Sequence, residues 1–174
     1  MNIRKNSIML ASFICLCLAS CSLSSYTNHS KNQFSKVLNH SQTTRTDGLI
    51  YSKENNTLFT GTIIEIFENG NLKSLITVKN GKADGHATIW YENGQRKLEF
   101  NVREGVREGM AYEWHRNGSL KAKAKYKDNN RHGLATTYYE NGVKKSVIRF
   151  INGIRQKKSN KEWSVDGSQV ISKN

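Results

Sequence analysis

Cysteine, proline and acidic residues are scarce in this sequence. It has no proline, 14 Asp and Glu against 27 Lys and Arg, and three cysteines, all within the first 21 positions. Only 36% of the 174 residues are hydrophobic, and the formal net charge is +13. This length and composition predict one modest domain with a thin core.

Common catalytic and metal-binding patterns are also absent. The sequence has no HExxH, GxSxG or GxxxxGK[ST] stretch, so it gives no support to a metalloprotease, a nucleophile elbow or a phosphate loop. Glu68, Glu92 and Glu140 recur at equivalent places, whereas a catalytic carboxylate pair needs two unlike environments that converge on one substrate. We favour turn and solubility roles for them, and we predict no enzyme activity, no metal and no cofactor.

The longest hydrophobic run is the uncharged stretch from Ile8 to Leu18, which follows Arg4 and Lys5. Eleven helical residues cover about 16 Å, roughly half of a ~30 Å hydrocarbon core, which disfavours a permanent membrane span. A basic start followed by such a run is typical of a signal peptide, with a plain hydrophobic N-terminal helix as the alternative.

The run leads into Leu18-Ala19-Ser20-Cys21, which resembles a bacterial lipobox. The resemblance implies diacylglyceryl transfer to the Cys21 thiol and cleavage before it, so residues 1–20 are predicted to be a lipoprotein signal peptide. Because two embedded acyl chains anchor stably, we expect a lipid-anchored, extracytoplasmic protein at the cell membrane or the outer membrane. Cys15 and Cys17 then leave with the leader, and no thiol remains for a disulfide, a metal or a nucleophile.

Residues 21–46 hold the lipidated cysteine and a stretch rich in Ser, Thr, Asn, Gln and Lys, without acids or an apolar period. We interpret this stretch as a flexible tether, although its composition fits a segment without a spacing role equally well. Removal of the leader lowers the net charge from +13 to about +11. Export separates this charge from DNA, so we do not expect nucleic acid as a partner.

From residue 47 to residue 174 the sequence repeats itself with a period of 24 residues. Asn-Gly pairs fall at 69–70, 93–94, 117–118 and 141–142. Each of four full units opens with a glycine and carries large side chains five and six places later: Gly61, Ile66 and Phe67; Gly85, Trp90 and Tyr91; Gly109, Trp114 and His115; Gly133, Tyr138 and Tyr139. A shortened copy precedes them in residues 49–59, and a partial copy with Trp163 follows. Such a period predicts a repeat architecture.

Each unit holds two β-prone stretches, such as 62–67 and 72–78, on either side of an Asn-Gly turn, which is a hairpin signal. Asn tolerates positive φ and Gly adopts it freely, so we expect a type I′ turn at these pairs. The second turn, as in residues 79–85, is longer and again contains glycine. The predicted fold is all-β: an elongated single antiparallel β-meander of about five tandem 24-residue hairpin repeats, with structural aromatic rows.

The pattern Gly-x4-(Trp/Tyr)-(Tyr/Phe)-Glu-Asn-Gly, followed by an apolar strand and a second Asn-Gly, resembles the MORN-repeat variant family of bacteria. The resemblance covers about residues 47–174 and implies an elongated antiparallel sheet used for contacts with proteins or membranes. Some relatives are labelled antitoxins, so an antitoxin or immunity-type protein that neutralises a partner by contact stays open as the alternative. The sequence departs from the pattern at His115, Asn129 and Lys158, and the last departure suggests a capping unit.

Basic residues recur with the same period. Lysine occupies one position in every full unit and arginine recurs in the long turns: Lys73, Lys97, Lys121 and Lys145, then Arg107, Arg131 and Arg155. Exposed unit charges ~10 Å apart repel by only about 0.4 kcal/mol in water, so such rows are tolerable. We predict that they bind an anionic partner, whether protein, phospholipid or envelope polymer; a solvated face that prevents edge aggregation is the alternative. The predicted function is a membrane-anchored, non-enzymatic interaction or scaffold module of the cell envelope.

Overall fold

The computed structural model of this chain describes residues 36–170, except for the side chains of residues 157–159. The predicted signal peptide, Cys21 and residues 22–35 of the predicted tether lie outside the described residues. No helix in the described part is both long and apolar enough to cross a membrane. Its elements are β1 (Val37–Asn39), the 3-10 turn η2 (His40–Gln42), β2 (Thr43–Thr46), β3 (Leu49–Ser52), β4 (Thr57–Leu58), β5 (Gly61–Ile66), β6 (Leu72–Lys79), β7 (Lys82–Trp90), β8 (Arg96–Arg103), β9 (Val106–Trp114), β10 (Leu120–Lys127), β11 (Asn130–Tyr138), β12 (Lys144–Ile151), β13 (Ile154–Trp163) and β14 (Gln169–Val170).

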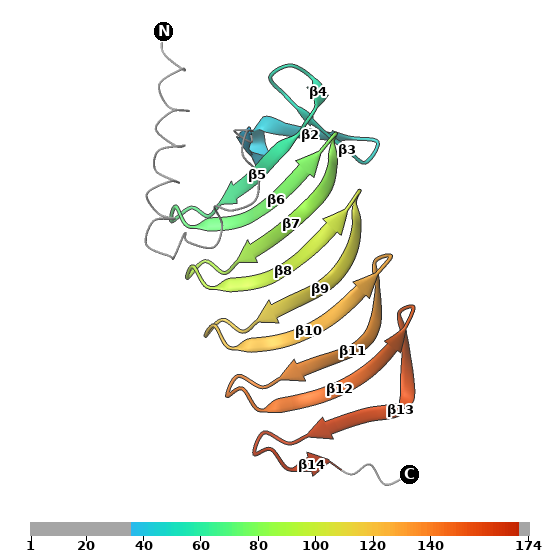
Figure 1. Cartoon of the computed structure of the whole chain (residues 1–174). Helices are drawn as coiled ribbons and strands as arrows, with labels where there is room; N and C mark the ends of the chain where they lie inside the picture. The colour runs from blue at the N-terminus through green and yellow to red at the C-terminus, as the bar shows by residue number, and fades with distance from the viewer. Residues whose placement is uncertain (1–35, 171–174) are drawn as a thin grey trace, which may run out of the picture. The chain divides into compact units, whose positions relative to one another are not determined.

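The strands β5 to β14 lie side by side in chain order within one eleven-stranded sheet, and each pairs antiparallel with the next (Figure 1). Every full unit contributes one hairpin, so the predicted all-β meander of tandem hairpins is confirmed. One pair departs from it, because β1 joins the first edge of this sheet parallel to β5. A second, three-stranded sheet of β2, β3 and β4 is the other departure from a single meander.

The predicted tether is wrong for residues 36–46, because they hold β1, η2 and β2. Leu38 is only 6% exposed, and Asn39 caps η2 by accepting a hydrogen bond from the Ser41 backbone N–H at 3.2 Å. The Gln42 side chain closes the capping box by accepting from the Asn39 N–H. Two neighbouring apolar residues in a polar run carry no period, and their pairing with β5 is distant in sequence. No local feature of the sequence therefore predicted these ordered elements.

The turns that contain the repeated Asn-Gly pairs are not of type I′. In the first of them Gly70 has a φ of +85°, but Asn69 has no positive φ. The Phe67 carbonyl accepts from the Gly70 N–H at 3.0 Å, and the Phe67 N–H donates to the Asn71 carbonyl at 2.8 Å. These bonds define a three-residue hairpin turn that places glycine in the left-handed conformation and leaves a bulge. Asn69 instead supports the turn by accepting from the Asn71 N–H at 3.0 Å.

The second turn of each unit has the geometry that we expected of the first. Its two central residues both have positive φ, as a type I′ hairpin requires: Asn80 and Gly81, Glu104 and Gly105, Asp128 and Asn129, Asn152 and Gly153. The length of the loop explains why the type I′ geometry belongs to the second turn and not to the first. Of the two turns in a unit, only the second leaves two residues between paired positions, such as Lys79 and Lys82. The departure at Asn129 is tolerated for the same reason, since asparagine adopts positive φ more readily than most residues.

The strand register sorts the side chains onto two faces, because residues directly opposite each other share a face. We call one the Phe100 face, after the row of paired residues Leu38, Ile63, Ile76, Ala87, Phe100, Ala111, Ala124, Ala135 and Ile148. The other is the Tyr112 face, after the row Thr88, Glu99, Tyr112, Lys123, Thr136 and Val147. Register shifts fall inside the long strands, and Figure 1 shows these strands bent.

The buried apolar core lies where the small sheet packs on the Phe100 face of β5 and β6. It consists of Leu38, Ile50, Phe59, Ile63 and Val78, with Ile76 packed against it. Beyond β6 the buried hydrophobic residues are alanines and one valine: Ala87, Val102, Ala111, Ala124 and Ala135. Most of the sheet therefore has no opposing layer in the described part.

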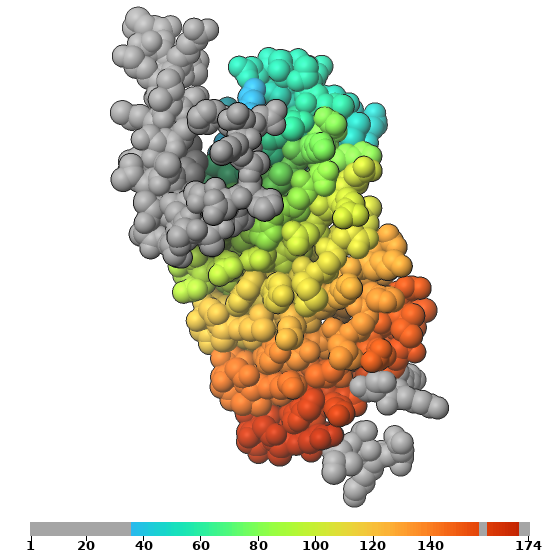
Figure 2. Space-filling model, in the orientation of Figure 1, coloured from blue at the N-terminus to red at the C-terminus, as the bar shows by residue number. Residues whose placement is uncertain are grey.

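Hydrogen bonds between neighbouring units replace that missing core. Each Asn of the Asn-Gly pairs donates from Nδ2 to a backbone carbonyl of the following unit, at 2.9 to 3.3 Å: Asn69 to Glu92, Asn93 to Arg116, Asn117 to Glu140 and Asn141 to Val165. At the opposite end of the strands, the second turns donate backwards: Gly81 to the Phe59 carbonyl, Gly105 to Ala83, Asn129 to Arg107 and Gly153 to Arg131. Each unit thus bonds to its sequence neighbours, and Figure 2 shows the units following one another in chain order.

Candidate binding face

The lysine row lies on the Phe100 face. Lys121 is 2.6 Å from Glu113, which is opposite Leu98, and Leu98 shares a face with Phe100 two residues on. Lys73 is likewise 2.8 Å from Glu65, whose partner Ser74 lies two residues before Ile76. Each lysine occupies the bulge next to the first turn, which aims it at the rings on the other side of the hairpin.

Three of the four lysines stand over an aromatic ring of their own unit. The distances from the ammonium nitrogen to the ring centroid are 5.8 Å for Lys73 and Phe67, 5.5 Å for Lys97 and Tyr91, and 5.2 Å for Lys145 and Tyr139. Such contacts stabilise by roughly 0.5 to 1 kcal/mol at exposed sites. In the third unit His115 replaces the ring, and Lys121 has its ion pair with Glu113 instead.

The lysines differ in their acidic partners. Lys73 and Lys121 each face a glutamate, whereas Lys97 and Lys145 face Ile89 and Thr137 at the same position of their units. The bond from Lys73 holds the pKa of the Glu65 carboxyl below its ordinary value, and the bond to Glu113 raises the pKa of Lys121. Among residues 36–170, Lys97 and Lys145 have no carboxylate within 4.0 Å.

The arginines that follow the second turns, on strands β9 and β11, contact aromatic rings. The Arg107 guanidinium lies 4.1 Å from the Phe100 centroid and 4.9 Å from the Tyr126 centroid. Arg131 lies 5.5 Å from the Phe150 centroid, and its Nε donates to the Tyr126 hydroxyl at 3.3 Å. A continuous chain of contacts, which we call the arginine stack, therefore crosses β8 to β12 in the order Phe100, Arg107, Tyr126, Arg131 and Phe150, with a hydrogen bond between Tyr126 and Arg131.

This arginine stack fixes two guanidinium groups without neutralising them. Neither Arg107 nor Arg131 has a carboxylate within 4.0 Å in the part of the chain that the structure describes. Arg155 differs, because it is 3.4 Å from Glu162. Guanidinium groups bind oxyanions through the N–H groups at their edge, which stacking on ring faces leaves accessible.

Both basic rows share the Phe100 face, at opposite ends of the strands. Arg107 is opposite Val102, which shares a face with Phe100, and Arg131 is opposite Tyr126. Between the rows lie the buried alanines and partly buried apolar residues such as Leu98 and Ile148. The sequence placed each row on a period, but only the register puts the two rows on one face.

The N-terminal end of this face is covered. At the place that arginine takes in later units, the second-turn hydrogen bond of Gly81 reaches Phe59, which is 2% exposed in the core. The accessible basic face therefore begins after β6 and extends to β13. The sequence did not predict that Phe59 covers this end of the face, because Phe59 appears in it only as part of a shortened copy.

The other candidate residues named from the sequence have structural roles. Glu68, Glu92 and Glu140 are exposed at hairpin ends, and the carbonyls of Glu92 and Glu140 accept the asparagine bonds between units. His115 Nε2 lies 3.0 Å from the Tyr138 carbonyl, which matches the bonds that Tyr91 and Tyr139 make to Trp114 and Trp163. Within residues 36–170, no three His, Cys, Asp or Glu side chains gather as metal ligands would.

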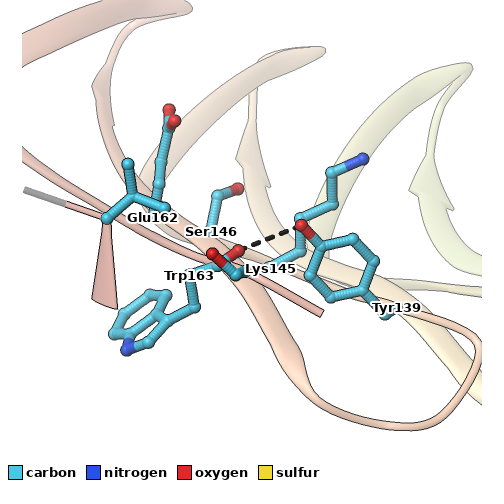
Figure 3. A pocket seen from close by; sticks show the side chains of 7 residues that line it. Tyr139, Lys145, Ser146, Glu162 and Trp163 are labelled. Atoms are coloured by element: carbon cyan, nitrogen blue, oxygen red, sulfur yellow. Dashed lines mark hydrogen bonds between the residues drawn. The ribbon is translucent and has the colours of Figure 1, made fainter. Parts of the chain in front are cut away.

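A pocket of about 280 Å³ lies on this face in the last unit (Figure 3). It is lined by Tyr139, Lys145, Ser146, Glu162, Trp163, Ser164 and Val170. The dashed line in Figure 3 is the bond from the Tyr139 hydroxyl to the Trp163 carbonyl, 3.0 Å long. Sequence reasoning did not find this pocket.

Comparison with known families gives one result. Residues 59–80, 83–103, 107–128 and 131–152 match the family described as MORN repeat variant. The matched segments follow the four structural units, and the last three begin just after a second turn. This family is a non-catalytic repeat module that generally mediates protein or membrane interactions. No curated protein matches the chain.

Proposed function

We propose that this chain, which belongs to the MORN repeat variant family, is a lipid-anchored interaction module of the cell envelope that binds an anionic partner on its Phe100 face. One observation carries the proposal. Four cations of this face, Lys97, Arg107, Arg131 and Lys145, have no acidic partner among the described residues, while rings hold each of them in place.

The arginines are the centre of the proposed site. A guanidinium that is already stacked loses less rotamer freedom when it binds, and it pairs with carboxylate or phosphate in two parallel hydrogen bonds. Lys73, Lys121 and Arg155 contribute less, because each is neutralised by its own glutamate. The proposed site is therefore narrower than the full rows predicted from the sequence.

The test compares two fourfold variants with the same loss of charge. The first changes Lys97, Arg107, Arg131 and Lys145 to Gln. The matched control changes four basic residues assigned by the register to the Tyr112 face: Lys123, Lys125, Arg149 and Lys161. Binding is measured with the chain from Ser22 onward, which carries no leader and no lipid, so that the anchor does not hold the protein on the membrane. The probes are vesicles with phosphatidylglycerol and polyglutamate, at low and at physiological salt.

We expect the first variant to lose most binding to at least one of these probes and the control to keep it. Basic residues near an anionic lipid surface contribute about 1 kcal/mol each, and this contribution weakens with salt. Equal losses in both variants would show that net charge alone acts, which would overturn the proposed site. Binding by neither wild type nor control would do the same.

The anchor is a separate part of the proposal, and it rests on the lipobox-like sequence before Cys21. Fourteen residues lie between Cys21 and Lys36, a span that reaches at most about 50 Å when fully extended. We expect full-length Cys21→Ala to appear in the soluble fraction of cells while wild type sediments with membranes. In-cell crosslinking of both proteins then identifies the partner. A mutant that still sediments, or a partner found in the cytoplasm, would contradict the anchor.

A further inference from the structure

The pocket of the last unit occupies a place that earlier units fill. The turn of this unit corresponds to the preceding one with a step of 25 residues, since the Ser164 N–H donates to the Ser168 carbonyl as the Tyr139 N–H donates to the Val143 carbonyl, each at 2.8 Å. At this step Ser164 takes the place of the aromatic ring and Val170 takes the place of the lysine. The last unit therefore lacks both members of the ring and lysine pair.

The loss of these two side chains explains the pocket. Ser164 and Val170 both line it, and the Tyr139 and Lys145 pair of the preceding unit forms another part of its wall. Figure 3 shows Tyr139 and Lys145 on one side of this space and the Trp163 carbonyl beside Tyr139, while the Trp163 ring points to the other face. Its volume of about 280 Å³ is close to the lower limit of ligand pockets, roughly 300 Å³, which suits one side chain rather than a large ligand.

The charges around the pocket favour a bound side chain that has acidic residues next to it in its own chain. Lys145 has no carboxylate partner in the described part, and the one acid of the lining, Glu162, is neutralised by Arg155 at 3.4 Å. Glu162 lies directly opposite Val170, at the place where Glu65 and Glu113 meet a lysine of their own units. A second copy of this chain would bring further basic residues to the pocket.

We propose that this pocket binds one aromatic side chain from an acidic segment of a partner protein, with the ring in the place that Ser164 leaves empty. The inference rests on the proposed function, because the acids of the segment pair with Lys145 and the neighbouring basic face. It adds a requirement that charge alone does not impose, namely an aromatic residue between the acids. The ring packs against Tyr139 and the backbone of Trp163, and the acids give the segment its direction.

The test uses the full-length protein and two labelled peptides, acetyl-Glu-Glu-Tyr-Glu-Glu-amide and the same peptide with Ala in place of Tyr. Binding is measured by fluorescence anisotropy at low salt. Burial of one ring predicts that wild type binds the tyrosine peptide about tenfold more tightly than the alanine peptide. Ser164→Tyr fills the pocket with the ring of the other units and should reduce this preference to about onefold.

Two controls separate the pocket from folding and from the basic face. Ser164→Ala removes the hydroxyl but leaves the space, so it should keep the preference for tyrosine. Ser164→Tyr should not lower the melting temperature, because it restores the residue type of the preceding unit. Equal binding of both peptides by wild type, or an unchanged preference in Ser164→Tyr, would overturn the inference but leave the proposed basic face intact. If neither peptide binds, the inference is also overturned, while the vesicle and polyglutamate measurements decide the proposed function independently.

Discussion

The two ends of the repeat array are built differently. At the N-terminal end a second sheet covers the Phe100 face and buries Ile50 and Phe59 against β5 and β6. At the C-terminal end the same face is open and holds a pocket, and large apolar side chains such as Ile154 are exposed, here by 69%. Both ends belong to the same series of hairpins, although the last unit is a partial copy. The difference teaches that stability is concentrated at one end, where a core exists, and accessibility at the other.

Removal of the Phe59 ring from the N-terminal core should have the largest effect on stability. Phe59 is 2% exposed, so Phe59→Ala removes a buried ring and should destabilise the fold by about 3 to 5 kcal/mol. Urea denaturation followed by circular dichroism measures the change. Leu134→Ala, at a residue 51% exposed in the fourth unit, should change stability by less than about 0.5 kcal/mol. Similar losses in the two variants would show that the core is not concentrated at the N-terminal end.

The opening glycines offer a second comparison between the ends. A Cβ at Gly61 would lie 2.1 Å from the Lys36 carbonyl oxygen and 2.8 Å from the Phe59 ring, whereas one at Gly133 would meet nothing within 4 Å. Both glycines have positive φ, +150° and +85°, so both alanine variants are strained by roughly 1 kcal/mol. Gly61→Ala should cost clearly more, because β1 must also move. Hydrogen exchange of the Thr62 N–H, which donates to the Lys36 carbonyl, should then accelerate only in Gly61→Ala.

The hydrogen bonds that asparagine Nδ2 donates between units should contribute to stability within the array but not in the last unit. Asn117→Asp keeps the acceptor for Ser119 but loses the Nδ2 donation to the Glu140 carbonyl, so we expect a loss of about 1 kcal/mol. In the last unit the residue is already Asp166, and a bond to the Ser168 backbone holds the pKa of its carboxyl below the ordinary value. Asp166→Asn should therefore change the melting temperature very little. A stabilising Asp166→Asn would reveal an acceptor beyond the last unit.

The glutamate and lysine pairs should give the smallest effect, which depends on pH. The folded pKa of Glu65 is lowered by Lys73, so its contribution is present above the unfolded pKa and is lost as the pH falls through the folded pKa. Glu65→Gln should cost roughly 0.2 to 1 kcal/mol at pH 7 and nothing near pH 2, because the pair is exposed. Glu162→Gln should cost less, because its ion pair with Arg155 is longer, 3.4 Å against 2.8 Å, and more exposed. Chemical denaturation at the two pH values measures both, and a loss in Glu65→Gln that persists near pH 2 would contradict the ion-pair explanation.

Much of the fold followed from the 24-residue period, because each unit's hairpin is local and its turn residues mark its ends. The turn geometry was assigned to the wrong turn. Asparagine and glycine occur in both turns of the unit, and the loop length that separates a two-residue from a three-residue turn depends on strand pairing. The order in residues 36–46 was missed because the parallel pairing of Leu38 with Ile63 joins distant parts of the chain.

The candidate face was predictable only in part. The lysine and arginine rows could be read from the sequence, since each recurs with the repeat. The sequence did not show which of these cations is neutralised by an acid, because the partners of Lys121 and Arg107 lie on other strands. The pocket had a readable signal that we did not use: serine stands at position 164 in a column of Phe, Tyr, His and Tyr.

The sequence by itself determined the class of architecture, the number of full units and the spacing of the basic residues, because periodicity and turn chemistry act over short distances. The tertiary structure decided which cations are neutralised, which face holds both rows, where the core lies and where the array leaves an empty place. These properties depend on the register between strands. Register is fixed by packing and by hydrogen bonds between units, so residues more than twenty positions apart decide it together.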